Sequence, residues 1–143
     1  MADKDFTVTV QIAAPPATVW AVLSDLEAWP SWTTSMTSVR RTSSGPLTIG
    51  TAVRVKQPSM PELTWVVTEV VAGERFTWES KSMGVTTIGR HVLLPKDGST
   101  EVSLVVEQSG LLAPVVALLM GKRGRRYVET EAAGLKRAAE AAA

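Results

Sequence analysis

The sequence of 143 residues has no cysteine and only one histidine, His91. The lack of cysteine excludes disulfides, thiolate metal sites and cysteine nucleophiles, and it is typical of proteins from reducing compartments. A single histidine excludes the two-histidine metal sites of many zinc and iron enzymes, and no spacing of carboxylates suggests a site built from oxygen ligands. We therefore expect no bound metal.

The motifs of several large enzyme classes are also missing. The sequence contains no GxSxG, no HExxH, no P-loop and no GxGxxG that follows a strand and opens a helix. It therefore offers neither an esterase-type nucleophile nor a nucleotide-binding loop. The N-terminal MADKDFTVTV carries acidic residues where a secretory signal would need a basic start and an apolar core. We expect a cytoplasmic protein that uses no cofactor.

Neither sign of charge is in excess. The chain has 15 Lys and Arg residues against 14 Asp and Glu, a formal net charge of +1, which gives no overall attraction to nucleic acid or acidic lipid. Hydrophobic residues make up 45% and charged residues 20%, as in many soluble globular proteins. Since no repeat or linker divides the chain and its length suits one core, we expect a single domain over residues 1–143.

The apolar residues follow the periods of strands and helices. Phe6 to Ile12 alternates apolar and polar residues, which is the pattern of a half-buried strand. After Pro16, Ala17 to Asp25 carries apolar residues at helical spacing, and LEAWPSW fits a second short helical turn broken at Pro30. The sequence thus predicts a strand followed by two short helices.

Six further strands are predicted between Ser35 and Gly110, where segments rich in Val, Thr and Trp alternate with turn signals such as SSGP and PKDGS. Gaps of hairpin length favour antiparallel pairing. After Gly110 the composition changes to Leu, Ala, Glu, Lys and Arg. This change predicts one long C-terminal helix, irregular near Pro114 and between Gly121 and Gly124. About seven antiparallel strands with all helices on one side form an α+β fold.

This order of elements carries specific sequence features. Near the N-terminus, IAAPPATVWAVLSDLEAWPSWTTSM has an apolar strand end and proline, followed by Val19-Trp20, Asp25, Trp29-Pro30 and Trp32. The strand region contains GERFTWES and PKDGSTEVSLVVEQSG. The predicted C-terminal helix carries Glu131, Leu135, Lys136 and Glu140. In these features nearly the whole chain resembles the START-like helix-grip (SRPBCC) superfamily, which includes polyketide cyclase and dehydrase-like proteins. The resemblance implies a curved antiparallel sheet that grips the C-terminal helix, with a deep apolar cavity between them. It implies no single activity.

Two sets of residues are candidates for a site in such a cavity. His91 and Glu69 are the candidates for general acid–base catalysis, because one titratable group in an apolar cavity is sufficient for proton transfer. The candidates for ligand binding are apolar and aromatic residues together with the histidine: Trp65, Phe76, Trp78, Met83, His91, Leu119, Met120 and Tyr127. Such walls select a small apolar or aromatic molecule, for example a lipid or a polyketide-like metabolite.

Strand alternation orients some of these side chains. In RFTWES, Phe76 and Trp78 share one face and are expected to point into the cavity, which directs Thr77 and Glu79 to solvent. Glu107 is expected to point away from the cavity, because the apolar residues of its strand form the opposite face.

Alternation leaves the two catalytic candidates undecided. GRHVLL and LTWVVTEVV have apolar residues on both faces, so His91 and Glu69 can each point either way. Each also has a structural interpretation. His91 can be a satisfied strand residue, and Glu69 can form a cross-strand surface pair with Arg90.

The segment LLAPVVALLMGKRGRR, residues 111–126, joins ten mostly apolar residues to a basic cluster. Ten residues of helix span about 15 Å, too short to cross a bilayer. Nucleic-acid binding is not expected, because acidic residues follow the basic cluster at once. The segment is predicted to begin the gripped helix, with Leu111 to Met120 over the cavity, Lys122 to Arg126 in water, and Gly121 and Gly124 as a flexible lid. Transient docking on a membrane surface stays open.

Two functions from different classes fit the sequence. The first is binding or transport of a small apolar ligand without covalent chemistry. The alternative is an enzyme of the polyketide cyclase or dehydrase type, in which His91 or a cavity carboxylate moves a proton. An interaction module for another protein is a third interpretation, which an open apolar groove would favour. The sequence does not determine the oligomeric state.

Overall fold

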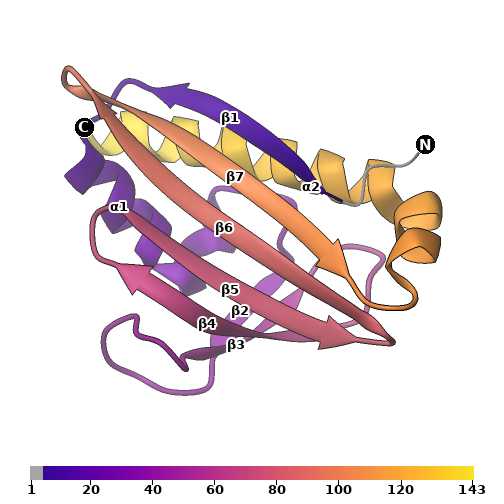
Figure 1. The fold of residues 1–143 in the computed structure, drawn as a ribbon. Coiled ribbons are helices and arrows are strands. Elements are labelled where there is room, and N and C mark those ends of the chain that lie inside the picture. The colour runs from indigo at the N-terminus through magenta and orange to yellow at the C-terminus, as the bar shows by residue number, and fades with distance from the viewer. Residues whose placement is uncertain (1–4) are drawn as a thin grey trace.

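A computed structural model of the chain describes residues 5–143. It contains a curved antiparallel sheet with one long helix across its concave face and two short helices at one end (Figure 1). The elements along the chain are β1 (Phe6–Ile12), α1 (Pro16–Ser24), the 3₁₀ helix η1 (Leu26–Ser31), β2 (Ser38–Arg41), β3 (Ala52–Lys56), β4 (Leu63–Val71), β5 (Arg75–Ser82), β6 (Val85–Lys96), β7 (Ser99–Ser109) and α2 (Ala113–Ala142). This is the predicted α+β helix-grip fold.

The seven strands are ordered β1-β7-β6-β5-β4-β3-β2, and every neighbouring pair is antiparallel. The strands from β2 to β7 follow one another through hairpins, as the short turn segments predicted. Only β1 is displaced in this order. It pairs with β7, so that the first and last strands in the chain lie side by side. The helices α1 and η1 fill the connection from β1 at one edge to β2 at the other.

The core lies between the concave face and the second half of α2. Ala132, Leu135 and Ala139 are buried, and their spacing places them on one helical face that meets the apolar residues of the sheet. The predicted apolar stripe of the helix is therefore confirmed. Trp29 of η1 is fully buried and donates a hydrogen bond from Nε1 to the Leu23 carbonyl at 2.9 Å, which holds η1 against the end of α1.

The last turns of α2 are also tied to the start of the chain. Lys136 Nζ donates to the Gln11 carbonyl at 2.9 Å, and the backbone amide of Ala13 donates to the Glu140 carboxylate at 2.8 Å. The Ala13 amide and the Lys136 ammonium lower the pKa of Glu140 below its ordinary value, because both favour the ionised carboxylate. Lys136 and Glu140 of the resemblance thus fix the C-terminal half of the helix.

Two expectations about the elements are wrong. The helix α2 runs without interruption through Gly121 and Gly124, so these glycines form no flexible turn and no lid. Thr77 lies on the convex face but is buried, because its cross-strand neighbours Glu69 and Arg90 carry long side chains and the Thr77 hydroxyl donates to the Glu69 carboxylate at 3.4 Å.

Candidate functional site

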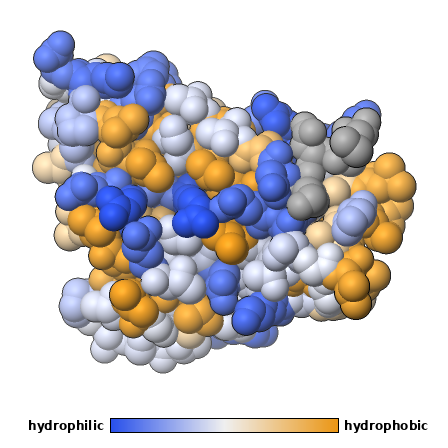
Figure 2. Space-filling model, viewed as in Figure 1, coloured by the Kyte–Doolittle hydropathy of each residue, from blue (hydrophilic) through white to orange (hydrophobic). Residues whose placement is uncertain are grey.

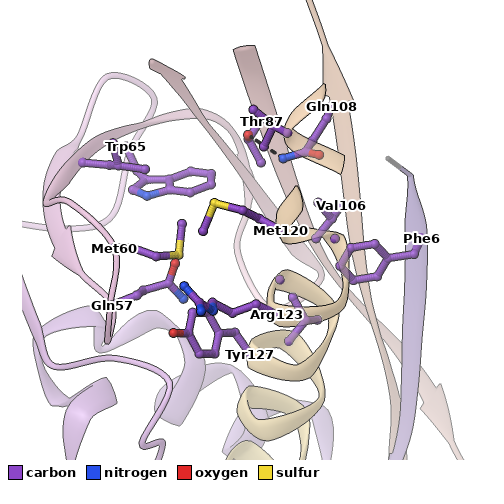
Figure 3. Close-up of a pocket in the computed structure, with 15 residues that line it drawn as sticks. Phe6, Gln57, Met60, Trp65, Thr87, Val106, Gln108, Met120, Arg123 and Tyr127 are labelled. Atoms are coloured by element: carbon purple, nitrogen blue, oxygen red, sulfur yellow. Dashed lines mark hydrogen bonds between the residues drawn. The ribbon is translucent and has the colours of Figure 1, made fainter. Parts of the chain in front are cut away.

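A cavity of about 140 Å³ lies between the sheet and the first half of α2. Its walls are mostly apolar, and side chains of β1, β4, β7 and α2 converge on it, with the loop before β4 closing one side (Figure 3). Trp65 faces Met60 and Met120 across the space. The other apolar side chains of the lining are Phe6, Leu63, Val106, Val116 and Val128.

A few polar groups interrupt these walls. Gln108 Nε2 donates to Thr87 Oγ1 at 3.4 Å on the sheet side. On the helix side the Tyr127 hydroxyl donates to the Pro58 carbonyl, which ties α2 to the loop before β4. Arg123 is the one charged residue of this lining, and it forms no ion pair with any residue in the range 5–143. The cavity is therefore apolar, with a single cationic group at its helix side.

A second cavity of about 70 Å³ lies deeper and is lined by Trp78, His91 and Glu131 among others. Gln57, Trp65, Thr87, Val106 and Val128 line both cavities and form the wall between them. These five residues therefore separate the larger space from the one beside His91.

His91 is buried and held on three sides by aromatic rings. Its imidazole stacks on Phe76 with 4.1 Å between ring centroids, and it meets Trp78 and Trp29 edge to face at 5.6 and 5.7 Å. Nδ1 lies 3.3 Å from the Phe76 carbonyl oxygen. Since a carbonyl oxygen only accepts, this contact places a proton on Nδ1 and directs Nε2 toward α2.

The group that faces Nε2 is Glu131, whose carboxylate oxygen Oε2 lies 3.6 Å away. Both side chains are more than nine-tenths buried, at 5% and 8% exposure for His91 and Glu131. A proton on either group makes their contact attractive, whereas a neutral Nε2 lone pair facing a carboxylate is repulsive. A buried imidazole and a buried carboxylate thus face each other between the sheet and the helix, beside the smaller cavity.

Glu131 is a site residue that the sequence prediction missed. A usable signal was present, however, because Glu131 lies three residues after Val128 and four before Leu135, on the apolar stripe itself. A carboxylate on a stripe that packs against a sheet needs a buried partner, and His91 is the one histidine of the chain.

The structure places the predicted residues in different surroundings. Trp65, Met120 and Tyr127 line the larger cavity, and Trp65, Trp78 and His91 line the smaller one. Phe76 points inward, as predicted from alternation, but it is fully buried behind His91 and lines neither cavity. Met83 and Leu119 are exposed at the surface, because Met83 occupies the β5–β6 turn and Leu119 lies on the outer side of α2.

Glu69 does not line either cavity, contrary to the position that its catalytic role would need. A β-bulge between Val67 and Glu69 shifts the register of β4 against β5 and reverses the side-chain alternation. Val67 points into the core, whereas Glu69 faces the convex side, where it pairs with Arg75 at 3.3 Å. The expected partner Arg90 pairs instead with Glu107 at 2.6 Å, on the same outer face.

The start of α2 covers the cavity less completely than predicted. Val116 and Met120 line it, and Ala113 and Ala117 are buried. The other apolar residues of the segment are exposed, because the helix turns them away from the sheet. Within residues 5–143, no helix is long and apolar enough to cross a membrane, and no three His, Asp or Glu side chains are grouped to hold a metal ion.

The same arrangement of sheet and helix occurs in solved structures. The protein TTHA0849 from Thermus thermophilus superposes with a TM-score of 0.78 at 21% identity, covering 97% of this chain and 99% of that one. The Zhui aromatase/cyclase from Streptomyces sp. R1128 has a TM-score of 0.69 at 18% identity, with 96% and 91% covered. A START superfamily protein from Mycobacterium smegmatis has a TM-score of 0.70 at 16% identity, with 93% and 97% covered.

At these identities the structures establish the fold and not the activity. No curated protein matches the chain in sequence. The model of one family, described as polyketide cyclase / dehydrase and lipid transport, matches residues 3–140. The helix that grips an apolar cavity and the match over nearly the whole length lead to one conclusion: the chain belongs to the polyketide cyclase / dehydrase and lipid transport family.

Proposed function

We propose that the protein binds a small apolar or aromatic molecule with an acidic group in the cavity between the sheet and α2. The observation that supports this proposal is the lining itself, in which Trp65, Met60 and Met120 surround a space with Arg123 as its one charged residue. An apolar cavity of about 150 Å³ admits a molecule of the size of benzene. The cavity of about 140 Å³ therefore fits one aromatic ring or a short acyl chain.

Several features suit the cavity to more than one ligand. Methionine side chains adapt to different shapes, and two of them face Trp65 across the larger space. Trp65 lines both cavities, so a rotation of its side chain would open the larger cavity toward His91 and admit a longer ligand. The acidic end of the ligand would remain at Arg123, where solvent is close.

The test compares benzoic acid with benzamide, which has the same ring and no charge. We expect calorimetric titration to show that the acid binds about fivefold more tightly, because an exposed charge-assisted contact contributes about 1 kcal/mol. Arg123→Gln should remove this preference and leave benzamide binding unchanged. Arg126→Gln is the matched control, since Arg126 lies outside the lining.

A second variant tests the cavity itself. Val106 lines both cavities, so Val106→Trp would fill the space between the sheet and α2 and should abolish binding of both compounds. Leu94→Trp is the control, because Leu94 is exposed on the convex face, and it should leave binding unchanged. Equal affinities of the two compounds for the unmodified protein would contradict the acidic ligand class. Binding that survives in Val106→Trp would contradict the cavity as the site.

The pair of His91 and Glu131 supports an alternative function, proton transfer in a cyclase or dehydrase reaction. The Zhui protein, which has the same fold, is described as an aromatase/cyclase. In this chain His91 Nε2 and Glu131 Oε2 lie 3.6 Å apart beside the smaller cavity. A linear poly-β-keto thioester is a suitable probe, because aldol cyclisation followed by dehydration lowers its mass by one water. We expect faster loss of water with the protein than without it, and none of this acceleration with His91→Phe. Equal rates in buffer and protein would leave ligand binding as the function.

A further inference from the structure

Large apolar side chains are exposed at one end of the molecule. Leu111, Leu118, Leu119 and Met83 are 94%, 74%, 76% and 82% exposed, and Leu112 and Val115 beside them are about half exposed. We call these six residues the apolar tip. Figure 2 shows apolar surface gathered at the end of the molecule where α2 begins. Such a cluster, in contrast to single exposed leucines, marks a surface that contacts another apolar phase.

The tip is assembled from two segments that are distant in the sequence. The β5–β6 turn places Met83 and Gly84 at positive φ, 51° and 77°, and the Leu112 amide donates to the Gly84 carbonyl at 3.3 Å. The turn is thereby joined to the start of α2. Methionine is unfavourable in this left-handed conformation, where asparagine or glycine is common. An exposed apolar side chain thus occupies a position that local backbone preference would give to a polar residue.

A basic cluster follows the tip on the same helix. It consists of Lys122, Arg123, Arg125 and Arg126, none of which forms an ion pair within the described range 5–143. Lys122 lies four residues after Leu118, and Arg126 four after Lys122, so both continue the outward face of the tip. The apolar surface therefore ends in a band of positive charge.

We propose that the apolar tip and the basic cluster dock the protein on an anionic lipid bilayer. An exposed apolar face with adjoining Lys and Arg residues is the pattern of helices that lie in the membrane interface, where basic residues are attracted to anionic lipid. A second copy of the chain is a poorer occupant. Two-fold pairing through the same face would bring the two basic clusters together without acidic partners.

Docking through the apolar tip places the larger cavity next to the lipid. Val116 and Met120 belong to the same turns of α2 as Leu118 and Leu119, but they line the larger cavity. An apolar molecule dissolved in the bilayer would thus meet the cavity without crossing water. The docking itself needs no ligand and does not depend on the proposed function.

The experiment measures co-sedimentation of the full chain with two kinds of vesicle, one of phosphatidylcholine alone and one of phosphatidylcholine and phosphatidylglycerol in equal parts. We expect binding to the anionic vesicles and little to the neutral ones. The double variant Leu118→Glu/Leu119→Glu should lower the partition coefficient about tenfold or more, because it removes two inserted side chains and adds negative charge. Ile49→Glu is the control, since Ile49 is equally exposed, at 70%, on the β2–β3 loop.

Folding is not at risk in these variants, because the replaced side chains are exposed, and circular dichroism verifies this. Met83→Asn should also weaken vesicle binding, although asparagine suits the turn better than methionine does. Equal binding by the double variant and the Ile49→Glu control would overturn the proposal, as would absence of binding to anionic vesicles. A concentration-dependent dimer that the double variant abolishes would assign the tip to a second copy instead.

Discussion

Replacing Gly134 by alanine is expected to destabilise the fold by about 3 kcal/mol, the upper end of the usual cost of overpacking a core. A Cβ at this position would overlap the carbonyl oxygen of Trp32 and come within 3.1 Å of the Trp32 carbonyl carbon and ring. The carbonyl belongs to the backbone and cannot rotate away, so in the alanine variant α2 must move away from the loop that follows η1. Urea-induced unfolding measures the loss.

Gly124→Ala is the matched control, because it makes the same change in the same helix. A Cβ at Gly124 meets no atom within 4 Å, so alanine there should stabilise the protein by about 0.5–1 kcal/mol through its higher helix propensity. The two substitutions are thus expected to have opposite signs. A loss of stability smaller than about 1 kcal/mol for Gly134→Ala would show that α2 does not pack as closely on Trp32 as described. Close packing matters for the site, because Glu131 lies one turn before Gly134 and faces His91.

Breaking the pair of His91 and Glu131 is the second large effect. We expect His91→Phe and Glu131→Leu each to cost about 2 kcal/mol, because each leaves the other polar group buried without this partner. The double variant should lose about 1–2 kcal/mol less than the sum of the single variants, since removing both partners leaves no unsatisfied group. The measurement is a double-mutant cycle of unfolding free energies at neutral pH.

A neighbouring pair provides the comparison for this cycle. Arg90 and Glu107 lie 2.6 Å apart on the convex face, and both are about two-fifths exposed. Solvent screens their interaction, so the coupling energy from the same kind of cycle should stay below about 1 kcal/mol despite the shorter distance. Additive effects at His91 and Glu131 would mean that the two groups do not interact, and would weaken the catalytic alternative.

The fate of Glu69 shows why part of the site could not be predicted. Alternation in LTWVVTEVV is readable only if the strand is regular, and the bulge after Val67 breaks it. Nothing in the local sequence marks the bulge. Where no bulge intervenes, as in β5, alternation correctly turned Phe76 and Trp78 inward. It did not predict that Thr77 would be covered, because the covering side chains come from β4 and β6.

His91 illustrates the second limit. Both faces of β6 carry apolar residues, so periodicity alone could not assign the face. The helix α2 covers only the concave side, and it brings Glu131 to the histidine from forty positions further along the chain. An interaction between such distant residues is decided by how the helix crosses the sheet, which no local pattern records.

The sequence by itself determined the order and type of the elements, the antiparallel pairing and the buried stripe of α2, because each follows from periodicity or turn residues within one segment. Only the tertiary structure decided that Glu69 faces outward, that His91 meets Glu131, and that Met83 joins Leu111 to Leu119 in an exposed tip. The physical reason is that an apolar residue is buried only where another element covers it. The first turns of α2 face the sheet with one side only, so the leucines on the other side, which predicted a covered cavity, remain at the surface.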